Sequence, residues 1–164
     1  QQHKQNASSH FICAHWRTGD WSFPLSPEGL ITAVNLVMEE EKIVFRKDSE
    51  EQGILVHGLF LASDATEEQR ELIANKLPLL DFGDGMYAVT RRVVEQEVPE
   101  LLATAVEQEA EGEQDDSILN AILEQLVCAK AVVFIGTRRS TFSETIVEER
   151  VRNGFSTDTN YLVP

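Results

Sequence analysis

Three short apolar runs, each ending in polar residues or glycine, constrain the fold of this chain more than any other feature. The strands that they predict are Phe11 to Ala14, Leu59 to Ala62 within a longer run from Ile54, and Val132 to Ile135. Apolar runs of about four to eight residues bounded by turn residues indicate buried strands of a parallel sheet. A helical pattern follows each run, and strands that alternate with helices indicate an α/β domain. We therefore expect a mainly parallel sheet flanked by helices.

Capping residues indicate where the helices begin. Ser26 followed by Pro27 predicts one helix start, because serine caps helices and proline suits the first helical position. The other helices are expected to begin at Thr66, at Asp115 or Asp116, and at Ser140. A short further strand is expected within residues 78–83.

Length and composition fit one folded domain. The chain has 164 residues, 42% of them hydrophobic, which suffices for a sizeable core. We expect a polar segment over residues 1–9 and the domain over residues 10–164, with residues 105–116 exposed and mobile. The net charge of -14 argues against general binding to nucleic acid or anionic membranes, because such binding draws on clustered Lys and Arg. No apolar stretch approaches the roughly 20 residues that span a bilayer.

The two cysteines settle no cellular compartment, whereas one glycosylation motif bears on it. Cys13 lies in the first predicted strand and Cys128 in a helical pattern. We expect each to behave as a small buried hydrophobic residue rather than as half of a bridge. Asn6, with Ser8 two residues later, matches the N-glycosylation acceptor pattern, which suits a secretory-pathway lumen.

The polar ends of the three runs are expected to meet, because ligands of parallel sheets bind in the crevice beyond the carboxyl ends of the strands. His15 and Arg17 follow the first run, Ser63 and Asp64 the second, and residues 136–143 the third. The third segment combines a glycine after a strand, basic residues and hydroxyl side chains with a helix N-terminus, which favours phosphate. Arg17 can grip phosphate oxygens through two parallel hydrogen bonds. Together these residues predict a site for a diphosphate.

Structural roles are the alternative for the same residues. Arg17 also suits a loop ion pair with Asp20, and Ser140 a plain helix cap. Arg138 and Arg139 also suit a balance of charge on an acidic surface.

Motifs of P-loop proteins, dinucleotide-binding domains, serine hydrolases and zincins are absent from the sequence. The four histidines show no metal-ligand spacing, so we expect no metal site.

Three segments resemble GDP-fucose protein O-fucosyltransferases. They are HWRTGDW from His15 to Trp21, LFLASD from Leu59 to Asp64, and FIGTRRSTFSETIVEER from Phe134 to Arg150. Trp16 stands where that family usually has leucine. The resemblance implies an inverting, metal-independent glycosyltransferase of two Rossmann-like halves, the GT-B arrangement. This chain matches the C-terminal, donor-binding half.

The resemblance also implies roles for individual residues. Arg17 would hold the diphosphate and stabilise charge on the departing GDP, which is the catalytic role, and His15 would lie near the nucleoside. The other donor-binding residues implied are Glu124, Thr137, Ser140, Thr141 and Phe142. Glu124 falls where the family often has an aspartate facing guanine, and a carboxylate can accept hydrogen bonds from that base. An exposed helix carboxylate is the alternative for Glu124.

Two aspartates and the general base stay open. Asp20 and Asp64 are candidates by location only, and each also suits the orientation of a loop or of Arg17. The acidic or amide residue that assists the acceptor hydroxyl in the family belongs to its N-terminal half. No general base can therefore be placed in this chain.

The leading hypothesis is a domain that binds GDP-fucose and, when complete, transfers fucose to a Ser or Thr hydroxyl of a protein. No cofactor is expected. The expected partners are the donor, the protein acceptor and the N-terminal half of the same enzyme, in the lumen of the endoplasmic reticulum or Golgi. A non-catalytic nucleotide or nucleotide-sugar-binding module is the alternative. An acidic interaction domain that uses residues 95–116 is a third hypothesis, and it needs no pocket.

Overall fold

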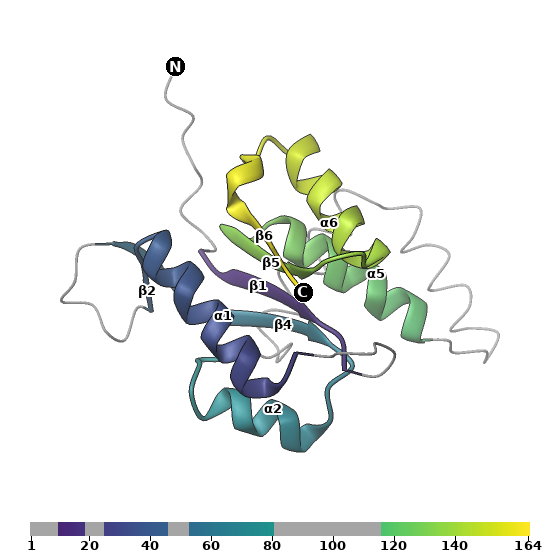
Figure 1. Cartoon of the computed structure of the whole chain (residues 1–164). Coiled ribbons are helices and arrows are strands. Elements are labelled where there is room, and N and C mark those ends of the chain that lie inside the picture. The colour runs from purple at the N-terminus through teal and green to yellow at the C-terminus, as the bar shows by residue number, and fades with distance from the viewer. Residues whose placement is uncertain (1–9, 19–24, 46–52, 81–115) are drawn as a thin grey trace.

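The computed structural model describes residues 10–18, 25–45, 53–80 and 116–164 of the chain, and these form an α/β domain (Figure 1). Its main sheet has the strand order β4-β1-β5-β6, and every neighbouring pair is parallel. Strands β2 and β3 form a separate parallel pair. The elements in chain order are β1 (Ile12–Trp16), α1 (Pro27–Glu40), β2 (Ile43–Phe45), β3 (Ile54–Val56), β4 (Leu59–Ser63), α2 (Glu67–Ala74), α5 (Asp116–Ala129), β5 (Val133–Thr137), α6 (Thr141–Arg152) and β6 (Asn160–Val163), with a 3-10 turn at Thr157–Thr159 before β6.

The three predicted strands are confirmed as parallel neighbours. Ile12 of β1 pairs with Leu59 of β4 on one side and with Val133 of β5 on the other. The carboxyl ends of the three strands therefore lie at one edge of the sheet. Each strand runs one or two residues further than the apolar run alone predicts, so His15 and Thr137 belong to strands rather than to loops.

The sheet differs from the prediction in three places. The apolar run from Ile54 divides at Gly58, where a Cβ atom would lie 2.5 Å from the carbonyl oxygen of Pro78, and its two parts join different sheets. Strands β2 and β6 were not predicted from the sequence, because they are short and lie in polar surroundings. Of the strand expected within residues 78–83, the described part makes only an isolated bridge between Leu59 and Leu79.

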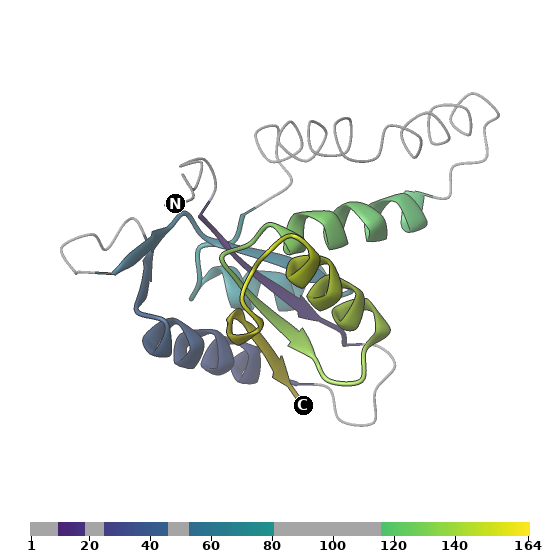
Figure 2. The ribbon, with the colours of Figure 1, turned by 90° about the horizontal axis from the view of Figure 1, so that it is seen from above.

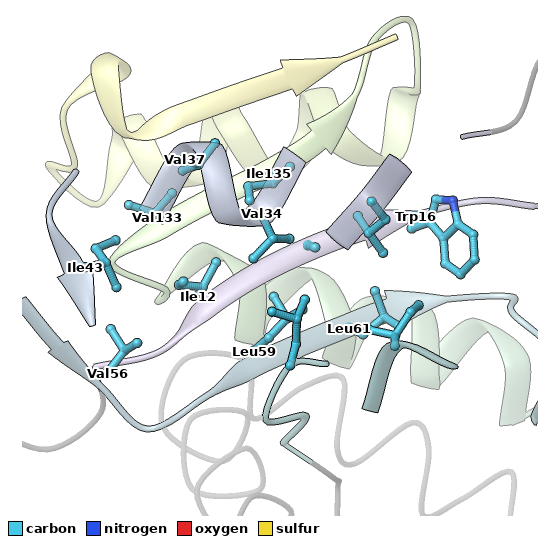
Figure 3. Close-up of a cluster of buried hydrophobic side chains, with 14 of the residues drawn as sticks. Ile12, Trp16, Val34, Val37, Ile43, Val56, Leu59, Leu61, Val133 and Ile135 are labelled. Atoms are coloured by element: carbon cyan, nitrogen blue, oxygen red, sulfur yellow. The ribbon is translucent and has the colours of Figure 1, made fainter. Parts of the chain in front are cut away.

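Two helix layers cover the sheet, one on each face (Figures 1 and 2). Strand residues alternate between the faces, as the pleat requires. On one face Ile12, Ala14 and Trp16 pack with buried side chains of α1 and α2 (Figure 3). On the other, Phe11 and Cys13 pack with residues of α5 and α6.

Three of the predicted helix starts are confirmed. Ser26 Oγ accepts a hydrogen bond from the backbone N–H of Gly29 at 3.1 Å. Thr66 and Gln69 form a reciprocal capping box, and Ser140 caps α6 by accepting from Ser143. No helix among the described residues is long and apolar enough to cross a membrane.

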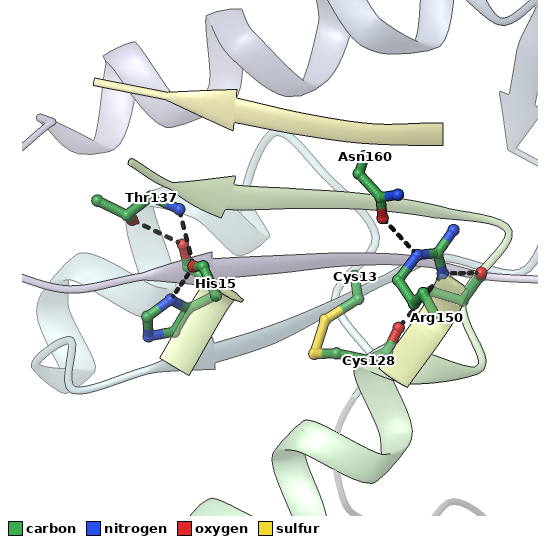
Figure 4. The surroundings of a disulfide bond; sticks show 8 residues. Cys13, His15, Cys128, Thr137, Arg150 and Asn160 are labelled. Carbon is green, nitrogen blue, oxygen red and sulfur yellow. Dashed lines mark hydrogen bonds between the residues drawn. A yellow bond between two sulfur atoms is a disulfide. The ribbon is translucent and has the colours of Figure 1, made fainter. Parts of the chain in front are cut away.

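The cysteine prediction was wrong, because Cys13 and Cys128 form a disulfide (Figure 4). Both residues are fully buried, as expected. The carboxyl-terminal turn of α5 packs directly on β1, which brings the two Cα atoms to 5.2 Å, a usual distance for a disulfide. The bridge joins segments 115 positions apart in the sequence.

Several predictions fall outside the described residues. They concern the polar segment 1–9 with Asn6, Asp20, and residues 105–115 of the acidic region. The boundaries proposed for the domain likewise stay a prediction.

Candidate functional site

The strand connections create a crevice at the carboxyl ends of β1 and β5. These neighbouring strands continue into helices on opposite faces of the sheet, β1 into α1 and β5 into α6. Such a switch point is where open α/β sheets bind ligands. An open pocket of about 300 Å³ lies there, which is at the small end of the range for ligand sites. Its lining residues are Arg17, Gln125, Arg139, Ser140, Thr141, Phe142 and Thr145.

Four residues singled out from the sequence therefore share one pocket: Arg17 from the end of β1, and Ser140, Thr141 and Phe142 from the start of α6. Arg17 is exposed, so its guanidinium is open to a ligand. Ser140 is buried and its hydroxyl already caps the helix, so the cap role that the sequence left open is real. Their parts in ligand binding stay predictions.

A hydrogen-bonded clasp of His15, Thr137 and Ser143 joins the two strands that carry the pocket (Figure 4). Ser143 Oγ accepts a hydrogen bond from the backbone N–H of Thr137 at 3.0 Å and lies 2.8 Å from His15 Nδ1. The hydroxyl of Thr137 donates to the carbonyl oxygen of His15 at 3.2 Å. Gly136 makes this packing possible, because a Cβ atom there would lie 2.9 Å from Ser143 Oγ.

His15 is a supporting residue rather than a lining one. It is only 4% exposed, and its ring stacks on that of Phe142 with centroids 4.4 Å apart. Burial, together with the positive charge of Arg17, lowers the pKa of His15 to about 4, against a smaller opposing effect of Asp64. The imidazole is therefore neutral at pH 7 and fixes Phe142, which reaches the pocket.

Glu124 lies beside the pocket on α5. The side chain is partly buried, and burial raises its pKa to about 7, with opposing effects of the charges on Arg70 and Arg17. Glu124 is therefore not an exposed helix carboxylate, and its contact with guanine stays a prediction. Glu124 is absent from the pocket lining, but its neighbour Gln125 belongs to it.

Asp64 and Trp16 organise the chain on either side of Arg17. Asp64 accepts hydrogen bonds from the backbone N–H of Thr18 at 2.7 Å and from its hydroxyl at 3.1 Å, which ties the segment after β1 to the end of β4. Trp16 is buried, and its indole N–H donates to the carbonyl oxygen of Leu25 at 2.8 Å. Both contacts hold the backbone that presents Arg17.

Two lining residues were missed from the sequence, Gln125 and Thr145. Thr145 lies one helical turn after Thr141, so helical spacing could have predicted it. Gln125 could have been predicted because it directly follows Glu124. Arg139 is one of the basic residues of the segment predicted to favour phosphate, with charge balance as the alternative, and it lines the pocket. No group of three metal-ligating side chains is assembled among the described residues, and the expectation of no metal site stays a prediction.

Comparison with known proteins shows a distant similarity to a fucosyltransferase. No family model matches the chain. The chain is 30% identical over 154 residues to GDP-fucose protein O-fucosyltransferase 2 of Drosophila melanogaster. The match covers 93% of this chain but only 26% of the relative, so the chain spans about a quarter of that protein's length. The similarity supports a glycosyltransferase-like function.

Proposed function

We propose that this chain is the donor-binding domain of a glycosyltransferase that transfers fucose from GDP-fucose to a Ser or Thr hydroxyl of a protein. The observation that carries the proposal is the pocket at the switch point. The pocket is lined by Arg17 and by residues Ser140–Phe142, which belong to two separate segments that resemble the fucosyltransferase family. The similarity to the Drosophila enzyme, which spans both segments, supports the same conclusion.

The proposed reaction inverts the configuration at C1 of fucose and needs no metal. The acceptor oxygen forms a bond to C1 of fucose on the face opposite the diphosphate, while the bond from C1 to the β-phosphate oxygen breaks. GDP leaves with that electron pair, and a base in the N-terminal half of the enzyme takes the hydroxyl proton. Arg17 stabilises the negative charge that develops on the diphosphate.

Other residues would shape the donor site. Phe142 offers an apolar ring backed by His15, and Thr141 offers a hydroxyl and a backbone N–H at the start of α6. Glu124 would accept hydrogen bonds from the guanine edge, which favours its ionised form. Thr137 acts through the clasp rather than by contact.

The disulfide supports a place in the secretory pathway. Disulfides persist in oxidising compartments such as the lumen of the endoplasmic reticulum. The Cys13–Cys128 bridge and the acceptor pattern at Asn6 suit that lumen. Both are consistent with an enzyme that modifies secreted proteins.

A non-catalytic nucleotide-sugar-binding module is the second candidate. The observation that favours it is the pocket lining, in which no carboxylate is found among the described residues. Both candidates bind GDP. Turnover of GDP-fucose by a protein that contains this domain together with an N-terminal half would exclude the second.

Calorimetric titration of the chain with GDP, GMP and guanosine tests the proposal. Arg17→Ala should weaken GDP binding at least tenfold, because removal of a charge-assisted bidentate contact costs on the order of 2 kcal/mol. Guanosine, which lacks phosphate, should lose far less. Arg17→Lys should recover little, since an ammonium group cannot form the paired hydrogen bonds. Equal GDP affinity with and without Arg17 would refute the site assignment.

A further inference from the structure

We propose that Arg139 is a second anion-binding arginine of this pocket, and that with Arg17 it selects ligands carrying two linked phosphoryl groups. The inference rests on the proposed function and deepens it, because it names a residue and a ligand preference that the proposal does not contain. It depends on how two adjacent arginines diverge after β5.

Arg138 is occupied by the edge strand. Its backbone N–H donates to the carbonyl oxygen of Val163 at 2.8 Å, and its side-chain Nε donates to that of Leu162 at 3.1 Å. Both contacts hold the end of β5 against β6. This side chain has a structural role and does not line the pocket.

Arg139 differs from Arg138 in both backbone conformation and surroundings. Its backbone is left-handed, with φ 61°, a conformation that residues other than glycine seldom adopt. The chain turns sharply there between β5 and the cap of α6, and the Arg139 side chain lines the pocket. The same turn therefore separates a structural arginine from one that faces the site.

Within the described part of the chain, the two lining arginines have no protein partner. Among the described residues, no hydrogen bond or ion pair is made by the side chain of Arg17 or Arg139, although the chain carries 28 acidic residues. They come from the ends of adjacent strands and line one pocket of about 300 Å³ that has no carboxylate in its described lining. Two like charges in one small pocket repel each other. An anionic ligand between them relieves that repulsion, and the positive pocket attracts such a ligand to an otherwise acidic protein.

The chemistry of the pair favours a diphosphate. A guanidinium binds the oxygens of one phosphoryl group through a planar pair of N–H donors. Two guanidinium groups that line one pocket can each bind one phosphoryl group of a linked pair, whereas a monophosphate engages one of them. GDP should therefore bind more tightly than GMP by a margin that depends on Arg139.

The decisive comparison uses Arg139→Asn with Arg138→Gln as the matched control. Asparagine adopts the left-handed conformation readily, so it removes the charge and keeps the turn. Arg138→Gln removes the same charge one residue away, outside the pocket. Calorimetric titration with GDP, ADP, GMP and inorganic pyrophosphate should show at least a tenfold loss of GDP and pyrophosphate affinity in Arg139→Asn. GMP should change less, and Arg138→Gln should stay within about twofold of wild type, as expected of a side chain that makes no ligand contact. Thermal melting checks that both variants are folded.

The outcomes separate this inference from the proposed function. Equal losses in the two variants would show a general charge effect and overturn the role of Arg139. Wild-type GDP binding that depends on Arg17 but not on Arg139 would overturn the inference alone. Pyrophosphate binding that depends on Arg139, with GDP and ADP bound equally well, would support the inference and count against a GDP-specific site. No binding of GDP or pyrophosphate to the wild-type chain would overturn both.

Discussion

Burial of His15 should make the domain less stable in acid. In the unfolded chain its imidazole titrates near 6.5, and in the folded protein burial lowers its pKa to about 4. Between these two values the unfolded state binds a proton that the folded state does not, so stability falls as the pH falls. The difference in pKa corresponds to about 3 kcal/mol of unfolding free energy, present at pH 7 and lost by about pH 4.

The substitution His15→Asn isolates this effect. The asparagine amide can occupy the place of Nδ1 and keep a hydrogen bond to Ser143 Oγ, but it does not titrate. Glu124 acts in the opposite sense: because its pKa is raised to about 7, it contributes stability at low pH that is lost as the pH rises from about 4.5 through 7. Both proteins retain Glu124 and the other carboxylates, so these contributions cancel in the difference between wild type and variant.

Urea unfolding without reductant, which keeps the disulfide intact, measures that difference in stability from about pH 4 to about pH 8. The stability advantage of wild type over His15→Asn should shrink by about 3 kcal/mol as the pH falls across this window. His57→Asn is the control, because His57 is exposed and the same change there leaves the buried site intact. Parallel curves for wild type and His15→Asn would refute a buried neutral imidazole.

Two further predictions concern stability. Reduction of the Cys13–Cys128 bridge opens the loop that the bridge closes in the unfolded chain, and so raises the entropy of that state. For a separation of 115 residues the chain-entropy model gives a loss of about 4 to 5 kcal/mol in the free energy of unfolding, measurable by urea unfolding with and without reductant. Arg150→Met should cost about 3 kcal/mol or more in thermal melting, because the buried guanidinium donates to the carbonyl oxygens of Ala131 and Val132, which would be left unpaired. The exposed Arg152→Met, which loses only a surface ion pair with Glu149, should cost less than about 1 kcal/mol; equal effects of the two arginine variants would contradict the role given to Arg150.

The parts of the fold that follow from local chemistry were predictable. The three central strands are continuous apolar runs because helices cover both faces of the sheet, and Ser26, Thr66 and Ser140 cap helices whatever the tertiary context. The convergence of Arg17 with the start of α6 at one edge of the sheet followed from the expectation that the strands are parallel. These inferences needed no contact between distant residues beyond the sheet itself.

The missed features depend on contacts that the local sequence does not encode. Strand β6 has four residues, too few for a clear alternation, and it forms because β5 offers an edge. The disulfide needs α5 to end directly over β1. Arg150 lies in a segment rich in charged residues that is typical of a solvated helix face, yet it is fully buried against the carbonyl groups after α5. Its burial lowers its pKa to about 10, and the donor-rich guanidinium is retained there because it satisfies several acceptors at once.

The disulfide also bears on how the pocket is positioned. Cys13 precedes Arg17 by four residues on the same strand and its exit, and Cys128 follows Glu124 by four residues, one turn of α5. The bridge therefore fixes the helix turn that carries Glu124 against the strand that presents Arg17. The clasp fixes the remaining wall, because it joins β1 to the end of β5 and the start of α6. With the three walls held by covalent and buried polar contacts, the lining side chains can be polar and exposed without loosening the site, as preorganised ligand binding requires.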